Sequence, residues 1–260
     1  MNLIIEKLKN SILNENEIAI CRLGQHSFLL KIADKLIAFD PYLSENKLRL
    51  IPPLISANDL AEFDLIFGSH DHSDHIDRSK LAEMSSGKAK FVFPRAIVKN
   101  LSQVPSDKII GMNDGEKIEI DGVSIWAVAA AHEFLDMGEN GLYPYLGFVV
   151  SCGNVRVYHS GDCCIYDGLL RKLKNLSVDI MLLPINGRDA VRLKNNCIGN
   201  MTYQEAADLA GWSSCKWVIP AHYDMFANNS IDPQLFVDYV NVKYPQLKTQ
   251  ILRPGEVVII

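Results

Sequence analysis

The sequence has no apolar run that approaches the ~20 residues of a membrane-spanning helix, which argues against a membrane protein. Charges are spread through residues 1–9, so the apolar segment of a signal peptide is missing as well. None of the six cysteines is spaced as Cys-x-x-Cys, and without an export signal we expect reduced thiols rather than a disulfide framework. Together these absences predict a cytoplasmic protein with no membrane partner.

Positive charge is also in short supply, because 26 Lys and Arg stand against 31 Asp and Glu and the formal net charge is −5. A protein that binds DNA or RNA must neutralise many phosphates, so we expect no nucleic-acid partner. A small anionic substrate is compatible with this balance. The basic cluster of Arg188, Arg192 and Lys194 is either an anion site or a solvated loop.

No linker rich in Pro, Gly or Ser, no low-complexity tract and no long-period repeat interrupts the 260 residues. With 48% apolar residues the chain is long enough for a large core, so we expect one domain over residues 1–260. The sequence does not decide the oligomeric state, and a homo-oligomer stays open.

Short apolar runs bounded by turn residues alternate with segments of helical spacing. The expected strands are residues 18–21, 28–30, 36–39, 64–67, 118–120, 123–128, 147–151, 155–159, 178–183, 216–219 and 256–260. The expected helices are residues 3–13, 77–84, 95–101, 167–176 and 203–209, and one that starts at Asp232-Pro233 and runs toward Tyr239. Two β-rich halves, each followed by helices, predict an αββα sandwich of two mixed β-sheets packed face to face with helices outside.

The strongest local signal is the run Ser-His-Asp-His-Ser-Asp-His over residues 69–75, directly after an expected strand. It places His70, His72, Asp74 and His75 in one short turn. Imidazole and carboxylate suit divalent zinc, manganese or iron, and these side chains cannot all reach one atom without strain. The run therefore predicts half of a two-metal hydrolytic centre.

Three more residues with ligand-type side chains follow apolar strands, namely His132, Asp162 and His222. Loops at strand ends have free side chains on a rigid base, so we expect all of these segments to meet on one rim of the sandwich. His159 lies in an expected buried strand and is interpreted as a core histidine or as a hydrogen-bond partner of a ligand. His26, at a turn, is expected to be a surface histidine.

The order His-x-His-x-Asp-His, then Ala-x-His, then Ser-Gly-Asp, then Pro-x-His resembles the metallo-β-lactamase superfamily over most of the chain. More narrowly, five stretches are similar to the L-ascorbate-6-phosphate lactonase-like group. They are GSHDHSDHID at 68–77, YHSGD at 158–162, PINGRD at 184–189, NMTYQEA at 200–206 and IPAHYDMF at 219–226.

The resemblance implies two divalent metal ions, manganese or zinc, with iron as a further option. One ion is held by His70, His72 and His132, the second by Asp74, His75 and His222, and Asp162 bridges them. It also implies a hydroxide shared by the metals as nucleophile, and Asp74 as the catalytic residue that manages the proton.

The resulting leading hypothesis is a hydrolase that opens a phosphorylated sugar lactone such as L-ascorbate 6-phosphate. Arg188 is the first candidate for binding the phosphate, Arg192 the second, and Tyr223 is a further candidate substrate contact. Residues 133–144 are a candidate lid. Two alternatives stay open: a two-metal phosphodiesterase acting on a small or cyclic phosphate ester, and a non-catalytic metal-binding module.

Overall fold

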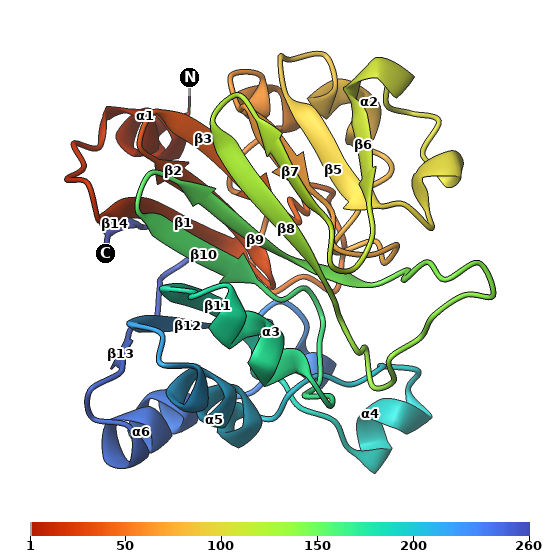
Figure 1. Ribbon diagram of the computed structural model, residues 1–260. Coiled ribbons are helices and arrows are strands. Elements are labelled where there is room, and N and C mark those ends of the chain that lie inside the picture. Colours follow the sequence, from red (N-terminus) through yellow and green to blue (C-terminus); the bar gives the residue numbers. More distant parts are fainter. Residues whose placement is uncertain (1) are drawn as a thin grey trace.

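The computed structural model describes residues 2–260 and consists of two seven-stranded β-sheets packed face to face (Figure 1). The first sheet has the order β14-β1-β2-β3-β4-β5-β6 and the second the order β13-β12-β11-β10-β9-β8-β7. The strands of the first sheet are β1 (Ile18–Gly24), β2 (Ser27–Ile32), β3 (Lys35–Phe39), β4 (Leu65–Phe67), β5 (Lys90–Pro94), β6 (Ile109–Met112) and β14 (Val257–Ile259). Those of the second are β7 (Lys117–Ile120), β8 (Val123–Ala129), β9 (Leu146–Cys152), β10 (Val155–His159), β11 (Ile180–Pro184), β12 (Trp217–Ala221) and β13 (Lys248–Thr249).

Helices cover the outer faces of both sheets, which confirms the predicted αββα sandwich (Figure 1). Over the first sheet lie α1 (Leu3–Asn10), α2 (Leu81–Met84) and the 3-10 turns η1 (Ala57–Leu60), η2 (Val98–Asn100) and η3 (Ser106–Lys108). Over the second lie α3 (Leu169–Asn175), α5 (Tyr203–Ser213) and α6 (Gln234–Lys243), while α4 (Ala190–Lys194) and η4 (Ala227–Asn229) belong to loops. Within residues 2–260, no helix is both long and apolar enough to cross a membrane.

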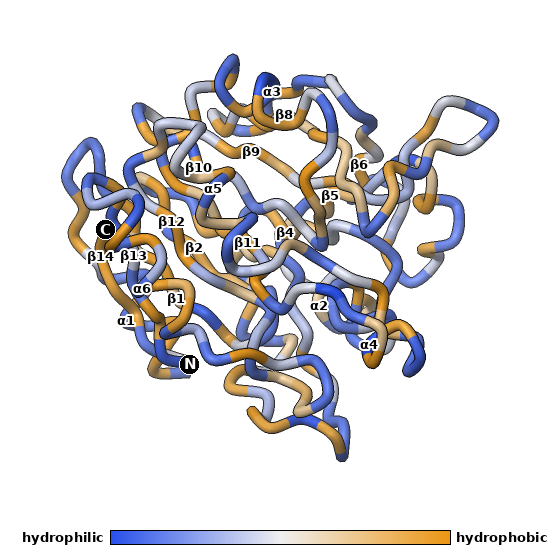
Figure 2. The backbone as a smooth tube through the Cα atoms, turned by 90° about the horizontal axis from the view of Figure 1, so that it is seen from below, coloured by the Kyte–Doolittle hydropathy of each residue, from blue (hydrophilic) through white to orange (hydrophobic). Residues whose placement is uncertain are grey.

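Because both faces of each sheet are covered, the central strands are apolar on both sides. In β1, Ile18 and Ile20 point into the core between the sheets, whereas Ala19 and Cys21 point toward the outer helices. Figure 2 shows the same distribution as orange segments along the strands and blue loops around them. This explains why the strands read as continuous apolar runs rather than as alternating ones.

The structure corrects several expected elements. Strands β5, β6 and β13 were not predicted, and the expected helices at 77–84 and 95–101 shrink to α2 and to η2. The Asp77 carboxylate is buried and accepts hydrogen bonds from the backbone of Leu43 and Ser44, so residue 77 belongs to a loop contact. The Arg95 N–H donates to the Met112 carbonyl, which keeps the start of the second segment at the edge of β6.

Strands β4, β8, β10, β11 and β12 end at the same edge of the sandwich. Strands β10, β11 and β12 are parallel, β8 runs in the same direction because both β8 and β10 are antiparallel to β9, and β4 ends nearby in the first sheet. The loops that follow β4, β8, β10 and β12 carry the predicted metal ligands. The fold therefore brings predicted ligands that are up to 152 positions apart in the sequence, from His70 to His222, to one rim.

Candidate metal centre

Three of the predicted ligands form a first cluster at this rim. One ligand atom from each of His70, His72 and His132 lies within 4.8 Å of the others. His70 Nε2 and His72 Nδ1 are 2.9 Å apart. Two residues of one turn, separated by Asp71, and one residue from the loop after β8 thus point their imidazoles at a common position.

A second cluster is formed by Asp74, His75 and His222, whose ligand atoms also lie within 4.8 Å of one another. The Asp74 carboxylate is 3.8 Å from His75 Nε2 and 3.7 Å from His222 Nε2. His222 follows β12 with a positive φ of 58°, a conformation that turns its side chain out of the strand line and toward the site.

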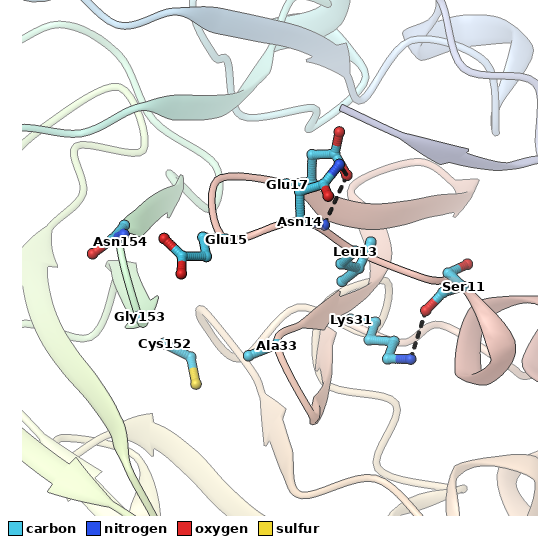
Figure 3. Close-up of a pocket in the computed structure, with 10 residues that line it drawn as sticks. All are labelled: Ser11, Leu13, Asn14, Glu15, Glu17, Lys31, Ala33, Cys152, Gly153 and Asn154. Carbon is cyan, nitrogen blue, oxygen red and sulfur yellow. Dashed lines mark hydrogen bonds between the residues drawn. The ribbon is translucent and has the colours of Figure 1, made fainter.

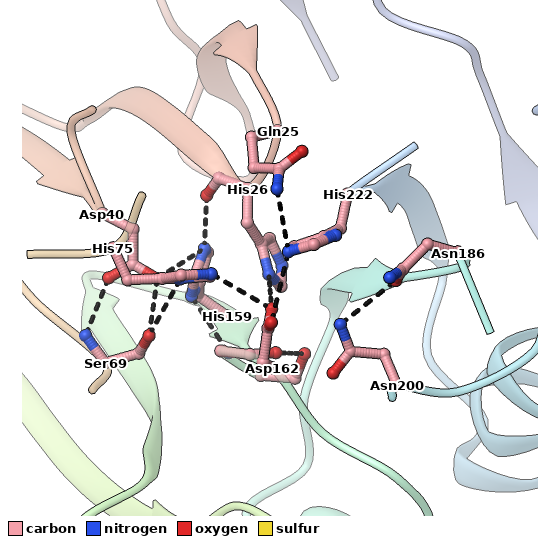
Figure 4. Close-up of polar contacts among 12 residues, drawn as sticks. Gln25, His26, Asp40, Ser69, His75, His159, Asp162, Asn186, Asn200 and His222 are labelled. Carbon is pink, nitrogen blue, oxygen red and sulfur yellow. Dashed lines mark hydrogen bonds and ion pairs between the residues drawn. The ribbon is translucent and has the colours of Figure 1, made fainter. Parts of the chain in front are cut away.

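Asp162 contacts both clusters, and Figure 4 shows it beside His75 and His222 of the second. Its Oδ2 is 3.7 Å from His132 Nε2 in the first cluster and 3.2 Å from His222 Nε2 in the second, and its Oδ1 is 3.3 Å from His75 Nε2. The two oxygens of one carboxylate therefore face ligands of both clusters. The structure brings all seven predicted ligands together.

Asp40 forms a supporting contact that sequence reasoning missed. His75 Nδ1 donates to Asp40 Oδ2 over 2.6 Å, and the same carboxylate accepts hydrogen bonds from the Ser69 amide and hydroxyl (Figure 4). The bond leaves His75 Nε2 free to face the site. The only sequence signal for Asp40 is its place directly after the expected strand at 36–39 and before Pro41.

A backbone carbonyl has the same effect on His132. Its Nδ1 donates to the Gly199 carbonyl over 3.1 Å, which turns Nε2 toward Asp162. A histidine that ligates a metal through one nitrogen commonly donates its other N–H to a carboxylate or carbonyl. His75 and His132 both fit this arrangement.

The expectation that His26 is a surface residue is wrong. His26 is fully buried, its ring centroid is 4.0 Å from that of His159, and its Nδ1 lies 3.6 Å from Asp162 Oδ1. His159 is buried as predicted, and its Nε2 donates to the His26 carbonyl over 2.8 Å. The β1–β2 turn that carries His26 inserts into the sandwich, which local sequence did not reveal.

The electrostatics of the site keep its carboxylate charged. Burial alone would raise the pKa of Asp162, but the neighbouring His222 and His75 hold it well below its ordinary value of 3.8. Burial lowers the pKa of His70 well below 6.5 and that of His26 to about 4. Burial opposes the charge of His75, but the carboxylates of Asp162, Asp74 and Asp40 raise its pKa well above 6.5. A divalent cation binds anionic oxygen and neutral imidazole nitrogen, so binding at His75 would release a proton.

Several buried polar atoms at the site have no hydrogen-bond partner. They include His75 Nε2, Asp162 Oδ1 and His26 Nδ1, which form a further cluster within 4.8 Å. A buried polar atom without a partner is costly, and a cation between His75 Nε2 and the Asp162 carboxylate would remove that cost for these two residues. These residues fit divalent metal ions.

Residues of both ligand clusters form the floor of a pocket of about 260 Å³. It is lined by His72, Ser73, Asp74, His132, Asp162, Asn196, Cys197, Ile198, His222 and Asn229. The walls come from the loop after α4 and from η4 rather than from the candidate lid at 133–144. A substrate that enters here meets amide groups and one apolar side chain beside the ligands.

The three predicted substrate contacts do not line this pocket. The Arg188 guanidinium donates to both oxygens of Glu205 over 2.6 and 2.7 Å. The side chain of Arg192 is paired with Asp189 and also donates to Asn229 and to the Ser230 carbonyl.

The third predicted contact, Tyr223, is buried. Its ring centroid lies 4.4 Å from the Arg22 guanidinium carbon. Each of the three side chains thus already contacts a charged residue of the protein itself: Glu205, Asp189 and Arg22, respectively.

A larger cavity of about 500 Å³, shown in Figure 3, shares no lining residue with the two ligand clusters. It is lined by Ser11, Leu13, Asn14, Glu15, Glu17, Lys31, Ala33, Cys152, Gly153 and Asn154. Its Lys31 donates to the backbone carbonyls of Lys9 and Ser11, and Glu17 accepts from Asn14. No predicted ligand belongs to it, so cavity size alone does not locate the chemistry.

Comparison with known proteins agrees with this geometry. The family described as "Beta-lactamase superfamily domain" matches residues 36–223. A UPF0173 metal-dependent hydrolase of Thermococcus kodakarensis is 34% identical over 238 residues, which cover 90% of this chain and 96% of the relative. A UPF0173 metal-dependent hydrolase of Staphylococcus aureus is 29% identical over 240 residues, with 90% and 96% covered.

Solved structures are similar over almost the whole chain. Igni18, described as a novel metallo hydrolase from Ignicoccus hospitalis, has a TM-score of 0.73 at 25% identity and covers 94% of this chain and 99% of its own. An isothiocyanate hydrolase from Delia radicum gut bacteria has a TM-score of 0.70 at 14% identity, with 92% and 98% covered, which shows the shared fold alone.

Fold, ligand clusters and comparisons together define the class of this protein as a metallo-β-lactamase-fold protein. Within that class the chain belongs to the UPF0173 metal-dependent hydrolase family.

Proposed function

We propose that this protein is a two-metal hydrolase that opens the ring of a small sugar lactone, with L-ascorbate 6-phosphate as the first substrate to test. The observation that carries the proposal is the pair of His/Asp clusters joined through Asp162 at the floor of the 260 Å³ pocket. The names of the relatives, metal-dependent hydrolases, support the hydrolytic part.

In this proposal one divalent ion is held by His70, His72 and His132, and a second by Asp74, His75 and His222, with Asp162 shared. Manganese and zinc are the preferred ions, with iron as a further option, because the donors are imidazole nitrogen and carboxylate oxygen. When bound, such ions lower the pKa of water and polarise a carbonyl or phosphoryl oxygen.

The chain's own residues would orient the substrate and move the proton. Asp74 faces the pocket, and Gln25 Nε2 donates to its Oδ2 over 2.7 Å, which leaves Oδ1 for a proton that passes from water to the leaving alkoxide. The amides of Asn196 and Asn229 line the wall and could donate to hydroxyl groups of a lactone.

A substrate phosphate would lie at the mouth of the pocket. Arg192 lies directly behind the pocket wall, because its Nε donates to Asn229, a residue that lines the pocket. To bind the phosphate, the guanidinium would exchange Asp189 for phosphate oxygens, which accept the same fork of N–H groups. Arg188 would likewise have to leave Glu205.

The test is the rate of lactone opening, followed by proton release, for protein loaded separately with manganese and with zinc. His70→Ala and His222→Ala serve as matched variants, one from each cluster. We expect both to lose the metal-dependent rate, and a wild-type rate no higher than theirs would reject the lactonase. A phosphodiester assayed in parallel decides the alternative, because diester cleavage without lactone opening assigns the same metal site to phosphodiester hydrolysis.

A further inference from the structure

The turn between β1 and β2 reaches into the metal centre from the first sheet, which also carries His70, His72, Asp74 and His75 in the loop after β4. Gly24 pairs with Ser27, so Gln25 and His26 form a two-residue turn. Both side chains are buried, and the His222 amide donates to the Gln25 carbonyl over 2.8 Å, which fixes the turn against the β12 loop (Figure 4). Neither residue belongs to the predicted ligand set.

Gln25 contacts one of the two carboxylates in that set. Its Nε2 donates to Asp74 Oδ2 over 2.7 Å. The same Oδ2 faces His75 Nε2 and His222 Nε2, and a ligating oxygen that also accepts a hydrogen bond is held in a fixed direction. Gln25 therefore sets the direction of Asp74.

His26 faces the second carboxylate. A neutral imidazole has one N–H, and both nitrogens of His26 face acceptors: Nε2 is 3.4 Å from the Leu182 carbonyl and Nδ1 is 3.6 Å from Asp162 Oδ1. The Leu182 carbonyl already accepts from the amide and the hydroxyl of Ser160. Asp162 Oδ1 has no donor, and a carboxylate is the stronger acceptor. The single N–H of neutral His26 is therefore more favourable at Nδ1, where it can donate to Asp162.

We infer that the β1–β2 turn is a positioning element for both carboxylates of the metal centre, with Gln25 donating to Asp74 and His26 Nδ1–H donating to Asp162. The inference rests on the metal-binding part of the proposed function and is independent of the substrate. Closing the 3.6 Å separation by a few tenths of an ångström satisfies His26 Nδ1 and Asp162 Oδ1, two buried atoms that otherwise lack a partner.

The first test reads the tautomer directly. In zinc-loaded, ¹⁵N-labelled protein, a long-range ¹H–¹⁵N spectrum should show His26 as a neutral imidazole with its proton on Nδ1. The His26→Gln variant assigns the signal by its loss. An unprotonated Nδ1 in the zinc-loaded protein would mean that His26 is itself a ligand or donates only to Leu182, and the inference would be overturned.

The second test measures zinc affinity by competition with a chelator. We expect His26→Phe and Gln25→Leu to raise the zinc Kd by about 10–100-fold, the usual effect of losing a residue that orients a metal ligand. His26→Gln keeps an N–H group and should recover part of the affinity. Cys163→Ala is the matched control, because Cys163 is buried next to Asp162 but its thiol donates only to the Cys164 carbonyl, and its Kd should equal that of wild type.

Urea unfolding of the metal-free variants separates positioning from misfolding. A His26→Phe protein with a native unfolding midpoint and a wild-type Kd refutes the inference. Failure of the wild-type protein to bind zinc or manganese would instead refute the proposed function itself, so the two failures are distinguishable.

Discussion

Removing the Asp224 carboxylate should destabilise the protein strongly. Arg22 in β1 has a side chain only 1% exposed, and its two terminal nitrogens donate to Asp224 over 2.8 and 2.5 Å across 202 residues of sequence. Asp224→Ala would leave this guanidinium buried with one remaining bond, to the Leu252 carbonyl. Losing one partner of a buried pair costs about 3–5 kcal/mol. Because Asp224 is 25% exposed, water compensates in part, and we expect about 3 kcal/mol.

For a chain of this size that loss lowers Tm by roughly 6–12 °C. The assay is urea and thermal unfolding of metal-free protein, followed by circular dichroism. Glu62→Ala is the matched control, because its ion pair with Lys9 is exposed and should contribute less than about 1 kcal/mol. The double variant Arg22→Met, Asp224→Leu should recover most of the loss. A cost below about 1 kcal/mol for Asp224→Ala would refute the reasoning, since such a value is typical of solvent-exposed pairs.

Three further outcomes are expected. Asp40→Asn removes the carboxylate that accepts from His75 and should weaken zinc binding by about 10–100-fold, measured by chelator competition; an unchanged Kd would contradict it. Phe148→Ala empties a fully buried position between the sheets and should cost about 3–5 kcal/mol in urea unfolding, and a loss under about 1 kcal/mol would show that the core is not packed there as described. Burial opposes the charge of Glu205, but hydrogen bonds from Arg188 and Thr202 lower its pKa below 4.5. The charged carboxylate therefore stabilises the fold above pH 4.5, and this contribution is lost as the pH falls through the lowered pKa. The loss of unfolding free energy caused by Glu205→Gln should shrink in acid, and a loss that stays the same there would contradict the prediction.

The ligands were predictable because each ligand segment directly follows an apolar run that indicates a strand. His70 follows an apolar strand by three residues, and His132, Asp162 and His222 likewise come directly after apolar segments. Strand direction then brings strand ends to one edge without any knowledge of side-chain packing. The sandwich was predictable for the same reason, since it follows from the order of apolar runs.

The environment of those ligands was not predictable, because it depends on contacts between remote segments. His26 reads as a turn residue until β1 and β2 are placed against the second sheet, which buries it beside Asp162. Arg188 reads as a free cation until Glu205, 17 residues later, is placed within its reach. Strands β5 and β6 were missed because their short runs have no hairpin or capping signal of their own.

The spread of the ligands over both sheets has a consequence for folding kinetics. His70 lies in the first half of the chain and His222 near its end, and both belong to loops that meet only after the two sheets have packed. Contacts of such long range form late in folding. Metal ions that bind there would stabilise the native state but not the transition state, so their addition should slow unfolding while leaving the refolding rate almost unchanged. The metal would thus extend the lifetime of the folded protein without guiding the chain toward it.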